Sequence, residues 1–377
     1  MQDTNQVAAR LAKAVHIVQK GEAAESKPCV LVTSVGGRSV GCQILQALLL
    51  HGEKYRIVAT DADAFSFGLY QVQHRYVVPF AQDPHYLPSI LRLVEMEGVN
   101  AILPGTEAEV QVLTRHRDDL ESVNCRLIAN PAEVVSLCSN KWRLYQWLKT
   151  NNIGAPRTVL AHEWEDLVAE VGFPIVGKPT EATGGSRSVA ILKDDKEVWQ
   201  YLEETGGSGV IFQEYIGASE NEYTVGVLVS ETGDVIDSIA IHRKLVGLSL
   251  GIERVISGFS YALSTGYSQG HVVKHPLIQQ ICEGLVVKLG ARGPANIQCR
   301  LVGDEVKVFE VHPRFSGTTS IRAEVGFNEP DVLIRNYLYN EAFGRLNYQT
   351  DVVAIRAFSN AIVPFSVMTN VPRASTL

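Results

Sequence analysis

Short apolar runs alternate with segments of helical apolar spacing in the first third of the chain. The apolar runs are Cys29–Thr33, Tyr55–Thr60, Asn100–Leu103 and Arg126–Ala129. The segments with helical spacing are Val40–Leu50, Ser89–Glu97 and Ala108–Leu120. Short apolar runs are typical of strands buried on both faces, and their alternation with helices predicts βαβ units in a parallel sheet.

The pattern changes beyond a helix predicted over Asn140–Thr150. From Pro156 to Gln213 the periodic pieces are shorter and Gly-rich turns separate them, which predicts a compact α+β insert. From Glu222 onward strand-like segments dominate and favour an antiparallel sheet. The predicted strands are Tyr223–Val229, Val235–Ile241, Ala295–Leu301, Val306–Val311 and Val352–Phe358, and the predicted helices are Pro276–Leu289 and Asp331–Asn340.

The N-terminal 27 residues are predicted to form a helix followed by a linker. The apolar positions at helical spacing are Val7, Leu11, Ala14, Val15 and Val18. Such a helix would dock on the body of the protein or on a neighbour. Gly21–Lys27 then reads as a linker that Pro28 closes.

Two predicted strands near the end of the chain carry polar residues on one face. Gly303-Asp304 is the turn expected between them. Because alternate residues of a strand face the same way, Glu310, His312 and Arg314 should share a side, and Gln298 on the partner strand can join them. Oxygen ligands, an imidazole and a guanidinium together suit a divalent metal and a phosphate. The alternative is the solvated outer face of a sheet.

Composition narrows the classes of function. The chain has 377 residues, with 46% hydrophobic and 20% charged residues, as in an ordinary globular protein. A net charge of -7 provides no broad attraction to nucleic acid or anionic membranes, so neither is an expected partner. The 6 cysteines form no CxxC pair and fit buried thiols in a reducing compartment, which favours a cytoplasmic protein. No apolar run approaches the roughly 18 residues that span a bilayer, and no signal peptide is recognised.

A Gly-rich turn follows the first predicted strand. The run from Gly36 to Gly41, with Asp61 further on, partly matches the dinucleotide-binding fingerprint. Arg38 stands at the second glycine position, where it would crowd a pyrophosphate. An NAD-dependent dehydrogenase is therefore one alternative. The other is that the turn serves only to pack the strand against the helix.

A second Gly-rich loop, residues 183–188, comes shortly after Lys178. Adjacent glycines and hydroxyl residues can present backbone N–H groups to an anion, and Lys178 adds a point charge at a strand end. No G-K-[ST] is present, so the loop is not a Walker A motif. Phosphate binding and a mobile Gly-rich hairpin are the two interpretations, and Lys178 favours the first.

Two further segments carry candidate ligand contacts. Phe212–Ile216 can offer backbone groups to an adenine edge, and the carboxylate of Glu222 can accept from ribose hydroxyls. The alternative is a pair of surface glutamates. His242-Arg243-Lys244, at the end of an apolar strand, suits a phosphoryl group or a substrate carboxylate, or is simply a solvated strand end.

Placed in order along the chain, these residues resemble the ATP-grasp superfamily, and most closely its carbamoyl-phosphate-synthase-like branch, which includes carboxylate–amine ligases. The resemblance runs from about Pro28 to Asn340. It implies an α/β Rossmann-like domain over residues 28–140, a linker helix and lid over 141–213, and an antiparallel C-terminal α+β subdomain over 214–345. Residues 1–27 and 346–377 would flank this body.

The resemblance also implies roles for individual residues. Lys141 and Lys178 would contact nucleotide phosphates under a lid loop of Gly184, Gly185 and Ser186, with His242 nearby; Glu214, Tyr215 and Ile216 would form the adenine hinge, and Glu222 would bind ribose. Gln298, Glu310 and His312 would bind magnesium, and Arg314 and Lys178 would steady the reacting groups. The third metal position is usually asparagine in this family. Either His312 therefore lies behind the metal ligands without binding the metal, or the site tolerates manganese.

The function implied by the resemblance is an ATP- and Mg²⁺-dependent ligase that activates a carboxylate as an acyl phosphate and couples it to an amine. Glu107, Arg243, Lys244 and Arg322 are the candidate contacts to these small-molecule substrates, with Glu107 alternatively capping the helix that follows it. Phosphorylation of bicarbonate or carbamate, as in carbamoyl-phosphate synthases, is the alternative within the superfamily. A dehydrogenase and a non-catalytic nucleotide-binding regulator are alternatives from other classes. We consider a homodimer as the oligomeric state.

Overall fold

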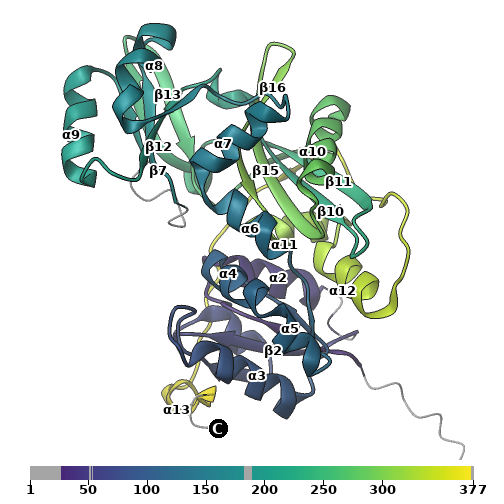
Figure 1. Ribbon diagram of the computed structural model, residues 1–377. Coiled ribbons are helices and arrows are strands. Elements are labelled where there is room, and N and C mark those ends of the chain that lie inside the picture. The colour runs from purple at the N-terminus through teal and green to yellow at the C-terminus, as the bar shows by residue number, and fades with distance from the viewer. Residues whose placement is uncertain (1–26, 51, 53, 182–188, 375–377) are drawn as a thin grey trace, which may run out of the picture.

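The computed structural model describes residues 27–50, 52, 54–181 and 189–374 and has three lobes (Figure 1). The predicted N-terminal helix lies outside the described residues, as do Gly184, Gly185 and Ser186 of the predicted phosphate loop. One lobe is the N-terminal domain, the second is a small lid, and the third holds the large antiparallel sheet.

The N-terminal domain is built on a five-stranded sheet in which each pair of neighbouring strands is parallel. Its order is β3-β2-β1-β4-β5, with β1 Cys29–Val32, β2 Arg56–Asp61, β3 His74–Val77, β4 Ala101–Leu103 and β5 Arg126–Leu127. The helices are α2 Val40–Leu49, α3 Tyr86–Glu97, α4 Glu107–Arg115, α5 Arg117–Ser122 and α6 Ala132–Ser139, with a 3₁₀ turn at Phe67–Gln71. The predicted parallel sheet is confirmed. Because strand order reverses between β1 and β4, their carboxyl ends border a crevice.

The prediction of one continuous helix over Ala108–Leu120 is wrong, because two helices occupy this range. The backbone at His116 leaves the helical region, with φ -113 and ψ 27, and separates α4 from α5. Strand β3 and helix α6 were not predicted. Two of the four residues of β3 are His74 and Arg75, so this edge strand lacks the apolar run that marked its neighbours.

The lid is a four-stranded antiparallel sheet of order β6-β9-β7-β8, covered by two helices. Its elements are β6 Thr158–Leu160, β7 Ile175–Pro179, β8 Ala190–Leu192, β9 Val210–Glu214, α8 Trp164–Val171 and α9 Asp195–Thr205. Helix α7, Lys141–Thr150, leads into it. Trp164, Leu167 and Phe212 are buried in a separate apolar core, so the lid packs as a unit of its own.

The third lobe contains a six-stranded sheet of order β16-β15-β10-β11-β14-β17 in which neighbouring strands are antiparallel. The strands are β10 Glu222–Val229, β11 Val235–Arg243, β14 Gly270–Val273, β15 Gly293–Val302, β16 Glu305–His312 and β17 Val352–Ala354; the helices are α10 Pro276–Leu289, α11 Thr319–Glu324 and α12 Glu329–Tyr339. The antiparallel prediction is confirmed. Val302 pairs with Glu305, so Gly303-Asp304 is the turn, as expected.

A hairpin that the sequence did not predict connects β11 to β14. Its strands are β12 Leu250–Ile256 and β13 Phe259–Ser264, and it extends from the third lobe to the lid (Figure 1). Arg254 on β12 pairs with Glu197 on α9 at 2.6 Å. Val255 and Phe259 are exposed, so the strands lack the apolar inner face that marks a core strand.

The C-terminal segment returns from the third lobe to the N-terminal domain (Figure 1). Strand β17 covers only Val352–Ala354 of the predicted Val352–Phe358. After helix α13, Phe365–Thr369, the N–H of Val77 donates to the Pro372 carbonyl at 2.8 Å and Val77 pairs with Arg373. The segment thus bridges two lobes and extends the edge of the parallel sheet.

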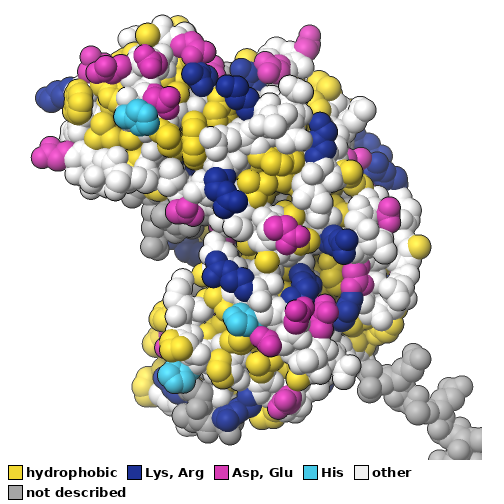
Figure 2. Space-filling view, viewed as in Figure 1, with side chains coloured by type: hydrophobic (Ala, Val, Ile, Leu, Met, Phe, Trp, Pro, Cys, Tyr) yellow, Lys and Arg dark blue, Asp and Glu magenta, His cyan; other side chains and the backbone are white. Residues whose placement is uncertain are grey.

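Charged side chains of both signs intermix over the face in Figure 2, and this face is hollowed between the lid and the N-terminal domain. Within the described part of the chain, no helix combines the length and the apolar character needed to cross a bilayer.

Candidate functional site

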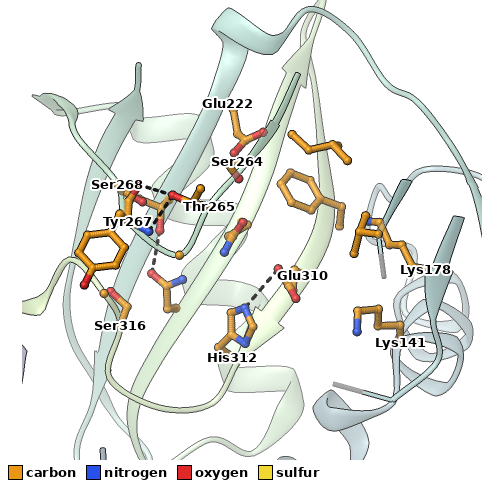
Figure 3. A pocket seen from close by; sticks show the side chains of 18 of the residues that line it. Lys141, Lys178, Glu222, Ser264, Thr265, Tyr267, Ser268, Glu310, His312 and Ser316 are labelled. Carbon is orange, nitrogen blue, oxygen red and sulfur yellow. Dashed lines mark hydrogen bonds and ion pairs between the residues drawn. The ribbon is translucent and has the colours of Figure 1, made fainter. Parts of the chain in front are cut away.

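A cavity of about 750 Å³ lies between the three lobes. Its walls come from the turn at 38–40, the start of α4 at 106–107, the lid strands β7 and β9, the strands β10, β15 and β16, and the loops 263–268 and 314–318. The cavity therefore joins the carboxyl-end crevice of the parallel sheet to the polar face of the antiparallel sheet. Figure 3 shows Glu310 and His312 between Lys141 and Lys178 on one side and Tyr267 and Ser316 on the other.

The polar face of β15 and β16 points into this cavity. Gln298 pairs with Glu310, and Asn296 pairs with His312, in the antiparallel register. Gln298, Glu310, His312 and Arg314 all line the cavity, as the alternation predicted. The Nε2 atom of His312 lies 3.2 Å from a carboxylate oxygen of Glu310. The structure therefore excludes the solvated outer face for these four residues.

Glu310 carries a negative charge among cations. Burial alone would raise the pKa of this carboxyl, but His312, Lys141 and Lys178 together lower the pKa well below its usual range. Burial has the opposite effect on an ammonium, and it lowers the pKa of Lys178 to about 8, although Glu310 counteracts it. The Lys178 Nζ donates to Gln213 Oε1 at 2.6 Å and lies over the Phe309 ring. Lys178 is thus held in place, with an ammonium that an incoming anion would stabilise.

Lys141 reaches the cavity from the first residue of α7. Asn140 caps this helix by accepting from the Arg143 N–H, and it also donates to the Glu181 carboxylate at 2.6 Å. The Lys141 backbone N–H donates to Thr180 O at 2.7 Å. These contacts tie the start of α7 to the end of β7, so both lysines are positioned by the lid.

The predicted adenine hinge lies where β9 leaves the lid. The Glu214 carboxylate does not point freely outward but accepts from the Arg157 N–H at 3.1 Å. The Tyr215 hydroxyl exchanges hydrogen bonds with both the N–H and the C=O of Ala262 on β13. Ile216 is buried and lines the cavity. The hinge backbone is therefore fixed from both sides, and Ile216 provides an apolar surface beside it.

Glu222 lines the cavity but is held by two arginines. One carboxylate oxygen accepts from Arg243 at 2.9 Å, and the other accepts from Arg300 at 3.0 Å. Arg243 is buried and also donates to Ser264 and to the Thr265 carbonyl. Arg243 is thus buried behind the cavity wall and is not part of it, which differs from its predicted place at the substrate. A ribose hydroxyl at Glu222 would have to share an oxygen with an arginine.

Three other predicted contacts also lie off the cavity wall. His242 stacks on Tyr223 and bonds the Glu220 carbonyl, and Lys244 is an exposed residue beyond the strand end. Arg322 is buried, pairs with Glu329 at 2.7 Å and donates to Asn296 at 2.7 Å. Burial in an ion pair accounts for Arg322, and the strand alternation turns His242 away from the cavity. The prediction that these three residues contact a ligand from the cavity wall is therefore corrected.

The donor set at the β15–β16 face fits a hard divalent cation. Glu310 supplies a carboxylate and Gln298 an amide oxygen, which are ligands that Mg²⁺ accepts, and Mg²⁺ usually takes its remaining ligands from water and phosphate. No group of three His, Cys, Asp or Glu suited to a metal occurs within the ranges that the structure describes. The protein thus offers part of a coordination sphere rather than a closed cage.

The far end of the cavity carries charges of both signs. A carboxylate oxygen of Glu107 lies 3.6 Å from a guanidinium nitrogen of Arg314. Glu107 does not cap α4, because Thr106 and Glu109 form the capping box. The buried Nε of Arg314 has no hydrogen-bond partner among the described residues. Ser316 and Thr318 add hydroxyl groups to this wall.

The Gly-rich turn at 36–41 is explained by packing. A Cβ on Gly41 would lie 2.0 Å from the Thr33 carbonyl oxygen, so the helix can approach the strand only through glycine. The Asp61 carboxylate accepts from the Gly36 N–H at 2.8 Å rather than being free for a ribose. We therefore do not propose nicotinamide binding.

Several cavity residues were missed. Asn296 and Arg300 lie on the same strand face as Gln298, two residues to either side, so the alternation that found Gln298 also indicated them. The residues in loops, Thr265, Tyr267, Ser268, Ser316 and Thr318, follow no such period. Arg38 lines the cavity too, although the sequence suggested only that it disfavours a dinucleotide.

Comparisons with known proteins agree with this architecture. The family model for the "PylC-like, N-terminal domain" matches residues 30–128, and the model for the ATP-grasp domain matches residues 138–318. The carbamoyl phosphate synthase large chain of Thermus thermophilus is 28% identical over 246 residues, which are 63% of this chain and 23% of that protein. The chain thus spans under a quarter of that relative's length.

Solved structures show the same fold. Biotin carboxylase from Campylobacter jejuni superposes with a TM-score of 0.61 at 14% identity, covering 87% of this chain and 73% of that one. N5-carboxyaminoimidazole ribonucleotide synthetase from Thermus thermophilus gives 0.59 at 16%, with 86% and 81% covered. L-amino acid ligase from Bacillus licheniformis gives 0.58 at 17%, with 83% and 74% covered. Residues 138–318 of this chain thus match the ATP-grasp domain and residues 30–128 match a PylC-like N-terminal domain, and the fold is that of these three structures.

Proposed function

We propose that the protein is an ATP-dependent ligase that joins a carboxylic acid to an amine. One observation carries the proposal: the wall of a single cavity carries two lysines, the Gln298–Glu310 face and, beside His312, the Glu107–Arg314 pair. The lysines and the Gln298–Glu310 face suit a nucleotide triphosphate, and the Glu107–Arg314 pair suits a small charged substrate. ATP and the acid can therefore meet beside Glu310.

At the nucleotide end, adenine would lie against Ile216 and bond the backbone of the 214–216 hinge. Lys141 and Lys178 would bind the phosphates, because both ammonium groups face the cavity from the lid. Glu310 and Gln298 would hold Mg²⁺, which neutralises phosphate charge when bound. His312 sits against Glu310 and would orient it.

Activation of the acid follows from its chemistry. A carboxylate is a poor electrophile, and attack of its oxygen on the γ-phosphorus of ATP gives an acyl phosphate and ADP. The amine then attacks the acyl carbon, and the amide forms as phosphate leaves and the amine loses a proton. Lys178 and Arg314 would stabilise the charge on the transferred phosphoryl group, and the enzyme contributes positioning and electrostatics.

The test is a matrix of acid and amine pairs, including amino acids, with ATP and Mg²⁺. Release of ADP that depends on both partners, together with an amide product by mass spectrometry, is the expected result. Acid labelled with ¹⁸O at the carboxylate should pass one label to the released phosphate. Amide formation without that transfer would exclude the acyl phosphate.

Bicarbonate with ammonia belongs in the same matrix. Turnover with that pair and with none of the organic acids would replace the proposed reaction by carbamoyl phosphate chemistry. Binding of ATP with no ADP formed in any combination would instead favour a regulatory protein without turnover. Repeating the active pair with Mn²⁺ in place of Mg²⁺ tests whether the site also tolerates manganese.

A further inference from the structure

The far end of the cavity is built from loops that three parts of the chain contribute. They are the turn at 36–39 before α2, the loop 264–269 after β13, and the loop 313–318 after β16. Figure 3 shows Tyr267, Ser268 and Ser316 gathered on this side. No shared strand sets their spacing, so something else must hold these loops at fixed distances.

Arg356 contacts two of these loops and the helix α2 that follows the turn at 36–39. It lies just beyond β17, outside the residues that either family model matches. Its guanidinium donates to the Ser268 carbonyl at 2.9 Å, to the Gln43 side-chain oxygen at 2.9 Å, and to the Gly317 carbonyl. Gln43 belongs to α2. A planar guanidinium with donors in fixed directions suits three acceptors better than a lysine would.

Tyr267 completes this junction. The Arg356 guanidinium lies 5.7 Å from the Tyr267 ring centre and that of Arg38 lies 5.6 Å from it. The Tyr267 hydroxyl donates to the Gly37 carbonyl at 2.8 Å. The loops themselves touch, since a Cβ on Gly317 would lie 2.3 Å from the Gly266 carbonyl oxygen. A small displacement of either loop would therefore alter the cavity wall.

We propose that Arg356 is a positioning residue for the acceptor end of the cavity, and that the C-terminal segment is a functional part of the site. It acts through Tyr267, Ser268 and Gly317, all of which line the cavity, and does not line the cavity itself. Calling this end the acceptor end rests on the proposed ligase function. The positioning of the loops by Arg356 does not depend on it.

The same segment offers a matched control. Arg345 also anchors it, through Asp237 at 2.8 Å and Glu283, but none of these three residues lines the cavity. Arg345→Ala therefore removes an anchor of comparable charge without touching the loops. Arg356→Ala removes all the side-chain hydrogen bonds to the loops and to Gln43, and Arg356→Lys keeps the charge but loses the planar set of guanidinium donors.

The first measurement is amide hydrogen exchange of the full-length protein, which requires no substrate. We expect exchange in peptides covering 264–269 and 314–318 to rise about tenfold in Arg356→Ala, because each hydrogen bond from a charged donor restrains its loop. Arg356→Lys should be intermediate, and Arg345→Ala should leave both peptides as in the wild type. Equal exchange in Arg356→Ala and wild type would overturn the proposal.

The second measurement separates the ends of the cavity. With the substrate pair from the matrix above, Arg356→Ala should raise the KM of the acid or the amine about tenfold while the KM of ATP stays within about twofold. Equal increases in the KM of ATP and of both substrates would show that Arg356 stabilises the protein in general and does not position the acceptor end. If the wild type turns over no pair, the ligase function fails, and hydrogen exchange still decides the role of Arg356.

Discussion

The two ends of the cavity are made differently. The nucleotide end is built from strands β7, β9, β10, β15 and β16, whose register fixes where each side chain points. The acceptor end is built from loops that are held by cross-links such as Tyr267 to Gly37 and Arg356 to Gly317. A wall made of strands can keep one chemistry while a wall made of loops changes its substrate, because loops tolerate substitution better than a paired ladder does.

The largest effect should come from the strand-built end. Glu310→Ala removes the carboxylate that the cations at this end surround, and we expect ATP turnover to fall by a factor of about 10² to 10³ or more with the fold intact. Steady-state ADP release and circular dichroism measure the two effects. Glu305→Ala, at the exposed start of the same strand, is the control. Wild-type turnover in Glu310→Ala would rule out the metal assignment.

A smaller effect, confined to the loop-built end, is expected for Glu107→Gln. The change removes a negative charge 3.6 Å from Arg314 while keeping the side-chain shape. The KM for the amine should rise about tenfold, since a charge-assisted contact is lost, and the KM for ATP should change by less than about twofold. Glu121→Gln on the surface of α5 controls for loss of charge. An increase only in the KM for ATP would contradict the division into two ends.

The smallest effect is a change in pH dependence. Burial lowers the pKa of Lys178 from 10.5 to about 8, so in the free protein its ammonium is lost as the pH rises through 8. Because the charged form would bind phosphate, affinity for MgADP should fall above that pH, by up to about tenfold per unit. In Lys178→Arg the affinity should be lower or equal but constant from pH 7 to 9.5. Calorimetric titration across this range measures it, and parallel curves for both proteins would exclude Lys178 as the titrating group.

The lowered pKa of Lys178 also makes the free energy of unfolding depend on pH. A lysine whose pKa is lowered on folding takes up fewer protons in the folded than in the unfolded state between about pH 8 and its ordinary 10.5. Lys178 should therefore make the protein less stable below pH 8 than above it, all else being equal. Bound nucleotide would reverse this contribution by favouring the ammonium.

How far the sequence could predict the structure follows the same division. Period-2 alternation placed Gln298, Glu310 and His312 on one face because a strand leaves each side chain only two directions. The substrate contact predicted for Arg243 rested instead on a cationic cluster at a strand end. Such a cluster looks the same in the sequence whether it meets solvent or, as Arg243 does at the end of β11, the buried carboxylate of Glu222. Burial of a charge depends on a partner distant in sequence, which no local pattern reveals.

The loop contacts were beyond prediction for a related reason. Arg356 and Gln43 are 313 residues apart, and neither carries a local signal that it would meet the other. Strand β17 also ended early, at Ala354, although the apolar pattern continued to Phe358. The hairpin β12–β13 was missed because its partner surface is the lid, and exposed strands lack the apolar alternation of a core.

That hairpin has a consequence for how the molecule opens. Two hydrogen bonds from the Arg254 guanidinium to the Glu197 carboxylate connect β12 to helix α9 of the lid. The Tyr215 hydroxyl connects the hinge to β13. A lid that swung away would have to take the hairpin along, and the loop 264–269, which follows β13 directly, would be pulled with it. An opening of the lid that admits nucleotide would therefore also displace the loop that forms the wall at the other end of the cavity.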